Sequence, residues 1–352
     1  MLLSENKYAF NIYYSKQNLG GIRSYIPPKD YKNKKKLHFL KNYFIKNVLF
    51  WQSGVIKTVI FKNFDIAFFM GDMSVISTWI AAIICRIRKK KVVFWGHGIY
   101  GNENFLKLRL RLLFLKIANV NVLYGDRARS KLNELGFDNR NILVIYNSLN
   151  YDEHLKLFNN LKKREKKGSV FFKNNRPTII FVGRLTKKKK IDILIKSLAI
   201  LKERNEIFNL KIVGEGSAKK MLISLAEDLL NSKNFNFFGE VYNESLLSEL
   251  IYNSDICISP GNIGLTAIHC LSYGTPVVSH SNFDNQMPEV ESIIVNKNGF
   301  LFKENDENDL ANKILYWLNK KKIKRENVRN IINEKYNPYY QKKIIDQLIL
   351  NG

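Results

Sequence analysis

Short apolar runs alternate along the chain with longer segments in which apolar residues recur at every third or fourth position. This alternation is typical of β-strands that are each followed by a helix, as in βαβ units with a parallel sheet. The runs cover residues 10–14, 55–61, 66–70, 91–95, 119–124 and 142–146 in the first half, and residues 178–182, 210–213, 235–238, 256–259, 276–279 and 292–295 in the second. Each half is therefore predicted to form its own parallel sheet in an α/β domain.

The least apolar stretch between the two halves marks the expected domain boundary. It includes the charge run at residues 162–168, which is typical of a solvated connection. We expect a first domain over residues 1–155, a linker over 156–176 and a second domain over 177–325. Residues 326–352 have helical periodicity, and we expect them to cross back onto the first domain.

Two stretches of the first half combine basic and bulky apolar residues. Residues 37–51 place apolar side chains on one helical face, and residues 105–117 also fit a helix, although their letters LKLRLRL alternate like a strand. The apolar face of the first stretch consists of Leu40, Tyr43, Phe44, Val48 and Trp51. Such a surface can lie in a bilayer interface, where its cations meet anionic headgroups, or it can pack on the core as an ordinary helix.

The composition indicates a strongly basic protein and a reducing compartment. The 352 residues include 57 Lys and Arg against 31 Asp and Glu, so the formal net charge is +26. Such a surplus attracts phosphates, anionic lipid or nucleic acid without choosing among them. The three cysteines form no CxxC pair, no secretory signal is visible, and Asp65 and Asp72 interrupt the most apolar window. We expect a cytoplasmic protein without a membrane span, with peripheral attachment to the inner face of the cell membrane as an alternative.

Glycine-containing turns follow the predicted strands of the second half. Gly183 and Arg184 end the first of these strands and precede four lysines, so a guanidinium and an ammonium could clamp a diphosphate there. Gly214, Glu215 and Gly216 end the next strand, where glycines let the backbone approach a ligand. Each turn, taken by itself, is equally compatible with an ordinary solvated loop.

A third turn is more specific. After the strand predicted at residues 256–259, the chain passes through a glycine-rich turn into a helix, which ends at a Gly-Thr-Pro sequence before the next strand. Backbone amides at the start of that helix would face the mouth where anionic parts of a substrate bind. The residues of this turn are Gly261, Asn262, Ile263, Gly264 and Leu265.

Taken in order with residues 285–289 and 298–301, these turns resemble the family-4 glycosyltransferases of the GT-B fold over residues 178–318. The resemblance implies two Rossmann-like domains with parallel sheets facing a central cleft. It also implies transfer of a sugar from a nucleoside diphosphate donor with retention of configuration. In that family the residues that match Arg184 and Lys189 hold the donor diphosphate, so no metal and no cofactor are expected.

One feature of that family is absent. Its members have two glutamates eight positions apart, which hold the transferred sugar and the nucleotide ribose, and these align with Gly261 and His269. At the sugar end, Asn262 or backbone amides would have to replace the carboxylate, whereas His269 can still hydrogen-bond a ribose hydroxyl. We expect an active transferase, with a degenerate, non-catalytic nucleotide-sugar or glycan scaffold as the alternative.

The first half supplies two further candidates. His97 lies between two glycines at the end of a predicted strand, where side chains point to a ligand crevice. The resemblance implies a histidine beside the transferred sugar at this point, and a histidine that satisfies its own loop is the alternative. Asp72 ends another strand and could face an acceptor. The family's amino-terminal glycine-rich loop is represented by Gly20 and Gly21, which a Pro- and Lys-rich segment follows instead of a helix.

The expected partners follow from these features. They are a nucleotide-sugar donor, a glycan acceptor and an anionic membrane surface. A lipid-linked acceptor from the synthesis of a bacterial surface polysaccharide (O-antigen, capsule or lipopolysaccharide) would explain the basic, apolar first domain. The charge also suggests a nucleic-acid-binding protein, but the glycines lie at strand ends rather than in an RNA-binding motif, and no basic-aromatic platform is evident.

Overall fold

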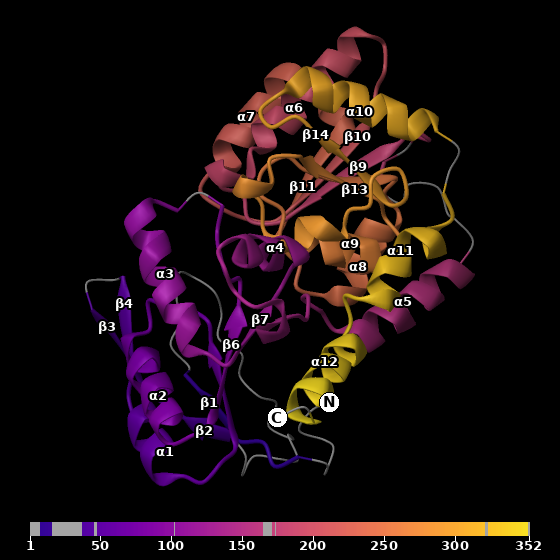
Figure 1. The fold of residues 1–352 in the computed structure, drawn as a ribbon. Helices are drawn as coiled ribbons and strands as arrows, with labels where there is room; N and C mark the ends of the chain where they lie inside the picture. Colours follow the sequence, from indigo (N-terminus) through magenta and orange to yellow (C-terminus); the bar gives the residue numbers. More distant parts are fainter. Residues whose placement is uncertain are drawn as a thin grey trace. The chain divides into compact units, whose positions relative to one another are not determined.

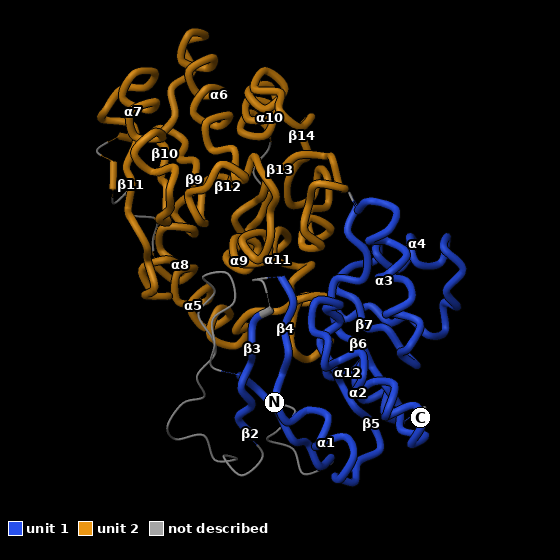
Figure 2. The backbone as a smooth tube through the Cα atoms, turned by 90° about the vertical axis from the view of Figure 1, so that its left-hand side faces the viewer, with its two compact units in different colours: residues 1–145, 341–352 blue, residues 146–340 orange. Residues whose placement is uncertain are grey.

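The computed structural model describes residues 8–15, 37–45, 48–101, 103–164, 171–172, 174–320 and 323–350. Gly20 and Gly21, and with them the expected amino-terminal loop, lie outside the described residues. The chain divides into two compact units, a first unit of residues 1–145 with 341–352 and a second unit of residues 146–340 (Figure 2). The last residues of the chain thus belong to the same unit as its first half.

The first unit contains a four-stranded parallel sheet whose strands follow chain order, and the two central strands are labelled in Figure 1. The four strands are β5 (Ile66–Met70), β6 (Lys91–Gly96), β7 (Val120–Leu123) and β8 (Ile142–Val144). Side chains alternate between the two faces. Val92 and Phe94 pack with α1 (Val55–Phe61), α2 (Ile76–Ile87), α3 (Phe105–Ile117) and α4 (Asp126–Glu134), whereas Val93 packs with Ile345 and Leu348 of α12 (Pro338–Leu350).

Two small pairs of strands complete the first unit. β1 (Ile12–Tyr14) pairs in parallel with β2 (Leu37–Phe39), and β3 (Asn42–Ile45) pairs antiparallel with β4 (Leu49–Gln52).

The second unit contains a six-stranded parallel sheet in the order β11–β10–β9–β12–β13–β14. The strands are β9 (Thr178–Val182), β10 (Asn209–Val213), β11 (Phe235–Gly239), β12 (Ile256–Ser259), β13 (Val277–His280) and β14 (Gly299–Phe302). Numbered within the unit, the order is 3-2-1-4-5-6, the doubly wound order of Rossmann folds. The order reverses between β9 and β12, which are hydrogen-bonded neighbours. That is the position where such sheets bind ligands.

Helices cover both faces of this sheet. One face packs with α6 (Ile191–Glu203), α7 (Lys219–Leu229) and α10 (Glu307–Asn319), which share a core with Phe181 and Ile212. The other α-helices in the described part of this unit are α5 (Tyr151–Lys163), α8 (Glu244–Tyr252), α9 (Thr266–Ser272) and α11 (Arg325–Glu334). α5 packs on α8 and α9. Part of the linker expected over residues 156–176 is therefore a packed helix of the second unit, in which Phe158 and Leu161 are buried.

Two predictions for the first half were wrong. Residues 55–61 form the helix α1 rather than a strand, because Val55 and Val59, one turn apart, are buried against α2. Residues 37–51 form three short strands rather than an amphipathic helix, because Tyr43 pairs with Trp51 across the β3–β4 hairpin. Residues 105–117 do form the helix α3, the first of the two interpretations of that stretch.

The prediction of a strand at residues 292–295 was also wrong. The last strand of the sheet is instead β14, at residues 299–302. Asn298 explains the difference, because its side chain accepts a hydrogen bond from the Ile294 amide (2.7 Å) and donates to the Ser292 carbonyl oxygen (2.9 Å). These bonds fold residues 292–298 into a turn. Gly299 then lets β14 approach β13, because a Cβ atom there would lie 1.9 Å from the Val277 carbonyl oxygen.

None of the described helices is both long enough and apolar enough to span a bilayer.

Candidate functional site

The turn after β9 and the turn after β10 pack directly against each other. The Leu185 amide donates to the Glu215 carbonyl oxygen at 2.8 Å. A Cβ atom on Gly214 would lie 1.9 Å from the Gly183 carbonyl oxygen, and one on Gly216 would lie 2.3 Å from the Leu185 carbonyl oxygen. Only glycine fits at these two positions, so the glycine pattern reflects close backbone approach. The Glu215 side chain forms an ion pair with Lys219.

Gly261 brings the turn after β12 onto the turn after β9. Its amide donates to the Lys189 carbonyl oxygen at 2.9 Å, and a Cβ atom there would lie 2.1 Å from the Lys188 carbonyl oxygen. No side chain fits at this position without movement of the backbone. The position that aligns with a glutamate of the family is therefore occupied by a backbone-to-backbone contact.

Lys189, whose carbonyl oxygen makes this contact, lies close enough to Arg184 for their charges to interact. Lys189 Nζ donates to the Asn262 carbonyl oxygen at 2.6 Å. Burial lowers the pKa of Lys189, the charge of Arg184 lowers it further, and the charge of Glu289 acts in the opposite direction. The Arg184 side chain is exposed and makes neither a hydrogen bond nor an ion pair with the residues that the structure describes. The two cations repel each other, and an anion bound between them would relieve that repulsion.

Gln286 holds the third turn in place. Its Oε1 accepts a hydrogen bond from the Ile263 amide (2.7 Å), and its Nε2 donates to Ser279 Oγ (2.8 Å) and to the His280 carbonyl oxygen (3.0 Å). Ser279 Oγ in turn donates to the Ser259 carbonyl oxygen (2.8 Å). The backbone of the turn is thus fixed by side chains of β13 and of the segment that follows it. Ile263 is fully buried, whereas Leu265 is 45% exposed.

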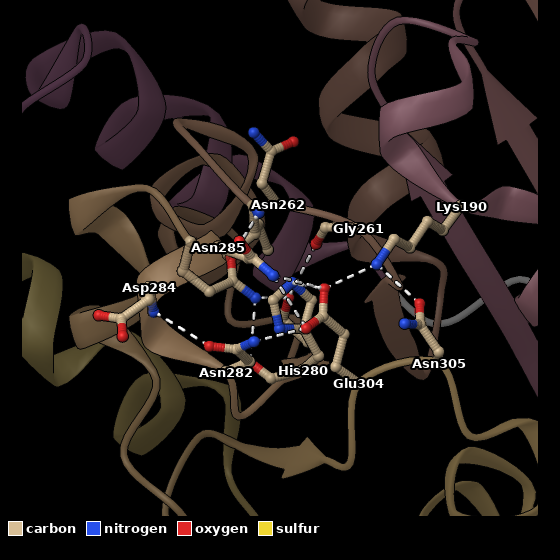
Figure 3. Close-up of polar contacts among 12 residues, drawn as sticks. Lys190, Gly261, Asn262, His280, Asn282, Asp284, Asn285, Glu304 and Asn305 are labelled. Carbon is tan, nitrogen blue, oxygen red and sulfur yellow. Dashed lines mark hydrogen bonds and ion pairs between the residues drawn. The ribbon is translucent and has the colours of Figure 1, made fainter. Parts of the chain in front are cut away.

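The carboxylate of Glu304 binds several side chains around the turn that carries Lys189. Glu304 accepts hydrogen bonds from Lys190 Nζ (2.7 Å), Asn282 Nδ2 (2.6 Å) and Asn285 Nδ2 (3.0 Å), and these side chains point toward it (Figure 3). Although burial opposes the shift, these bonds lower the pKa of Glu304 to about 2. Lys190 is therefore held by Glu304, whereas Lys189 donates to the third turn.

Glu289 is a buried carboxyl group of the same region. Its Oε1 accepts a hydrogen bond from Asn147 Nδ2 at 2.5 Å, and its Oε2 has no hydrogen-bond partner among the described residues. Burial raises the pKa of Glu289. Gln286 and Glu289 belong to the motif at residues 285–289, but the sequence alone predicted no role for either side chain.

His269 lies in a cluster that sequence reasoning missed. His269 Nε2 donates to Glu244 Oε1 at 2.7 Å, and the Tyr273 hydroxyl donates to the same oxygen at 2.6 Å. His154 stacks on His269 with ring centroids 5.0 Å apart, and its Nε2 lies 3.6 Å from Glu244 Oε1. Burial lowers the pKa of His154 to about 4. A carboxylate therefore does lie beside position 269, but α8 supplies it.

The ligand atoms of His154, Glu244 and His269 are close enough together to be considered for a metal ion. The two rings are nearly parallel, with 13° between their planes. Ring-nitrogen lone pairs lie in the ring plane, so a single ion cannot lie in both planes without rotation of a ring. The arrangement fits a hydrogen-bonded cluster better than a metal centre.

The structure brings His97 and Asp72 near each other in the first unit. Burial lowers the pKa of His97, Arg111 lowers it further, and the charge of Asp72 acts in the opposite direction. The His97 ring packs against Tyr124 with centroids 5.1 Å apart, and its buried Nδ1 has no hydrogen-bond partner in the described part of the chain. Asp72 Oδ1 accepts hydrogen bonds from both the amide and the hydroxyl of Ser74.

Most of the second unit is similar in sequence to glycosyltransferases. Residues 162–335 match the family model described as glycosyl transferases group 1. The chain is 31% identical to an uncharacterized glycosyltransferase of Haemophilus influenzae over 137 residues, which are 38% of this chain and 37% of that protein. It is 28% identical to the poly(ribitol-phosphate) alpha-N-acetylglucosaminyltransferase of Staphylococcus aureus over 161 residues, or 44% and 31% of the two chains. The matches span about a third of the length of these relatives.

Solved structures resemble this chain over most of its length, including the first unit. The apo lipopolysaccharide outer core galactosyltransferase WaaB superposes with a TM-score of 0.65 at 16% identity, covering 85% of this chain and 78% of that one. Anabaena HepE in complex with UDP superposes with a TM-score of 0.63 at 17% identity, covering 84% and 80%. The fold is therefore GT-B, and the predicted class of two Rossmann-like α/β domains is confirmed.

Proposed function

We propose that residues 162–335 are a group 1 glycosyltransferase domain that binds a nucleoside diphosphate sugar, and that the chain transfers the sugar with retention of configuration, as family-4 enzymes do. The observation that carries the proposal is the pair Arg184 and Lys189 at the switch point of a 3-2-1-4-5-6 sheet. One of these cations has no partner within the described residues, and the other is partly desolvated beside it. A diphosphate supplies the negative charge that this pair lacks.

The same pair suits the chemistry of transfer. The bond between the anomeric carbon and the diphosphate oxygen breaks, and negative charge grows on that oxygen. A guanidinium and an ammonium already in position stabilise the charge without a metal ion. The acceptor hydroxyl forms its new bond on the face that the diphosphate leaves, and its proton passes to the leaving phosphate. No enzyme nucleophile takes part in this scheme.

The ribose end of the donor site would be formed by His269 together with Glu244. One oxygen of Glu244 is held by His269 and Tyr273. Its other oxygen is left to accept hydrogen bonds from ribose hydroxyls. At the sugar end, Asn262 and the backbone of the Gly261 turn would take the place of a carboxylate, because a side chain at 261 has no room.

For the acceptor, we propose a lipid-linked glycan of bacterial surface polysaccharide synthesis. Support comes from a structural neighbour that is described as a lipopolysaccharide outer core galactosyltransferase and from a relative described as acting on poly(ribitol-phosphate). His97 and Asp72 would serve the sugar and the acceptor, and the protein would work in the cytoplasm.

A non-catalytic nucleotide-sugar-binding scaffold is the second candidate, and the blocked Cβ position at Gly261 favours it. Binding and turnover separate the two. We expect UDP- or GDP-sugars to raise the melting temperature and to be consumed slowly by hydrolysis or transfer. Stabilisation without any turnover across a panel of donors and glycan acceptors would support the scaffold.

The donor-binding proposal has its own control. Arg184→Ala should abolish the stabilisation by the donor, whereas Lys187→Ala, which removes a charge from an exposed side chain of the same turn, should keep it. If Arg184→Ala keeps the full shift, the diphosphate does not bind at this pair.

A further inference from the structure

Three consecutive helices of the first unit form one layer with an apolar outer surface. α1 packs on α2, α2 packs on α3, and all three contribute to the core on the same face of the sheet. Their outward side chains are large and exposed, up to 78% for Leu106. These residues are Ile60, Phe61, Ile80, Ile83, Ile87, Phe105, Leu106, Leu110 and Leu113.

The exposed residues follow helical periodicity. Ile80, Ile83 and Ile87 form one stripe along α2, and Leu106, Leu110 and Leu113 form another along α3. A soluble surface seldom exposes two apolar stripes on neighbouring helices, and such a surface generally has a partner.

The charges of this layer are of one sign. α1, α2 and α3 contain no Asp or Glu. Among the other described α-helices only the seven-residue α9 lacks an acidic residue. The exposed basic residues of the layer are Lys57, Arg86, Lys107, Arg109 and Lys116. The third arginine of these helices, Arg111, is turned inward and forms a buried ion pair with Glu103, so it is not part of this surface.

We propose that the outer surface of α1–α3 binds the interface of an anionic lipid bilayer, with the leucines and isoleucines entering the acyl boundary and the basic side chains contacting phosphate headgroups. Cations interleaved with aliphatic side chains match the two layers of such an interface. A second copy of this chain is a poorer occupant, because the same surface would bring like charges together with no carboxylate between them. The inference does not depend on sugar transfer.

The experiment measures binding of the full chain to vesicles. We expect co-flotation with vesicles of phosphatidylcholine and phosphatidylglycerol, much weaker binding to phosphatidylcholine alone, and release by high salt. The triple variant Leu106→Gln, Leu110→Gln, Leu113→Gln should reduce the bound fraction about tenfold, and Arg86→Gln with Arg109→Gln and Lys116→Gln should remove the preference for anionic lipid.

Matched controls keep the test clear. Met221→Gln, Leu246→Gln and Tyr316→Gln replace exposed apolar side chains of the second unit and should leave vesicle binding unchanged. Circular dichroism should show that each variant folds. Failure of the wild type to float, or unchanged flotation of the leucine variant, would overturn the proposal. So would a dimer in solution that the leucine variant dissociates while vesicle binding is absent, because a second copy would then be the occupant.

Discussion

The amide of Gly261 donates a hydrogen bond to the carbonyl oxygen of Lys189, 72 positions earlier in the chain, at 2.9 Å. This contact fixes the loop after β12 against the turn after β9, on either side of the point where the strand order reverses. Lys189 Nζ completes the link by donating to the Asn262 carbonyl oxygen. Glycine at position 261, where the family has a glutamate, therefore allows the backbone contact that holds Lys189 beside the loop after β12.

The first prediction concerns that contact. Gly261→Ala should destabilise the fold by about 1–3 kcal/mol and weaken donor binding, because the added Cβ meets backbone rather than a movable side chain. Urea unfolding and donor titration measure the two effects. Gly264→Ala is the matched control for stability, because a Cβ there meets only Met287 Cγ at 3.9 Å. Equal stability of the two variants would contradict the steric argument.

The second prediction follows from the burial of His154. Its folded-state pKa of about 4 lies below the ordinary 6.5, so the unfolded chain binds the proton more readily between these values. The contribution of His154 to stability is therefore complete above pH 6.5 and decreases as the pH falls toward 4, by at most about 3 kcal/mol. Urea unfolding at pH 7 and pH 4.5 should show a smaller loss for His154→Phe than for the wild type. If the free energy of unfolding falls by the same amount in both proteins, His154 does not cause the loss of stability in acid.

Much of the second unit can be predicted from sequence because the inner strands of its sheet, β10, β9, β12 and β13, are buried on both faces. Such strands read as continuous apolar runs, and β9 and β12 have the predicted bounds. α1 could not be predicted in this way. Its residues are mostly β-branched, which favours a strand, and only packing on α2 decides for a helix.

The residues of the candidate site likewise fall into a group that the sequence predicts and a group that only the structure reveals. The glycine turns and the Arg184–Lys189 pair follow strand ends, and strand ends can be read from sequence. Glu244 could not be found, because it reaches His269 from another helix and no spacing connects positions 154, 244 and 269. The steric reason for Gly261 was equally hidden, since it depends on where the Lys188 carbonyl oxygen lies.

The third prediction concerns metal. Transfer from the donor should persist after treatment with EDTA, because Arg184 and Lys189 supply the positive charge that a metal would otherwise provide. The test is turnover before and after chelation, together with metal analysis of the purified protein. Loss of turnover that Mg²⁺ or Mn²⁺ restores would contradict a metal-free reaction. Stoichiometric zinc that disappears in His154→Phe would instead reassign the His154–Glu244–His269 cluster.

The fourth prediction concerns Glu304, which receives hydrogen bonds from three side chains. Glu304→Gln removes the ion pair with Lys190 and should lower the free energy of unfolding by about 1–3 kcal/mol. Because the pKa of Glu304 is lowered to about 2, its contribution is present above pH 4.5 and is lost as the pH falls toward 2. Urea unfolding at pH 7 measures the effect. Glu206→Gln, at an exposed glutamate, serves as control and should change little.

The fifth prediction separates the two cations of the donor site. Arg184→Ala should weaken donor binding at least about tenfold without lowering the melting temperature of the free protein, because the Arg184 side chain has no partner within the described residues and its charge repels that of Lys189. Lys189→Ala should weaken donor binding and also lower that melting temperature, because it leaves the Asn262 carbonyl oxygen without its donor. Calorimetric titration with a nucleoside diphosphate and thermal unfolding without ligand give the two readouts. If Lys189→Ala loses affinity with no change in melting temperature, Lys189 binds the donor without supporting the loop; if it loses only stability, Arg184 alone binds the diphosphate.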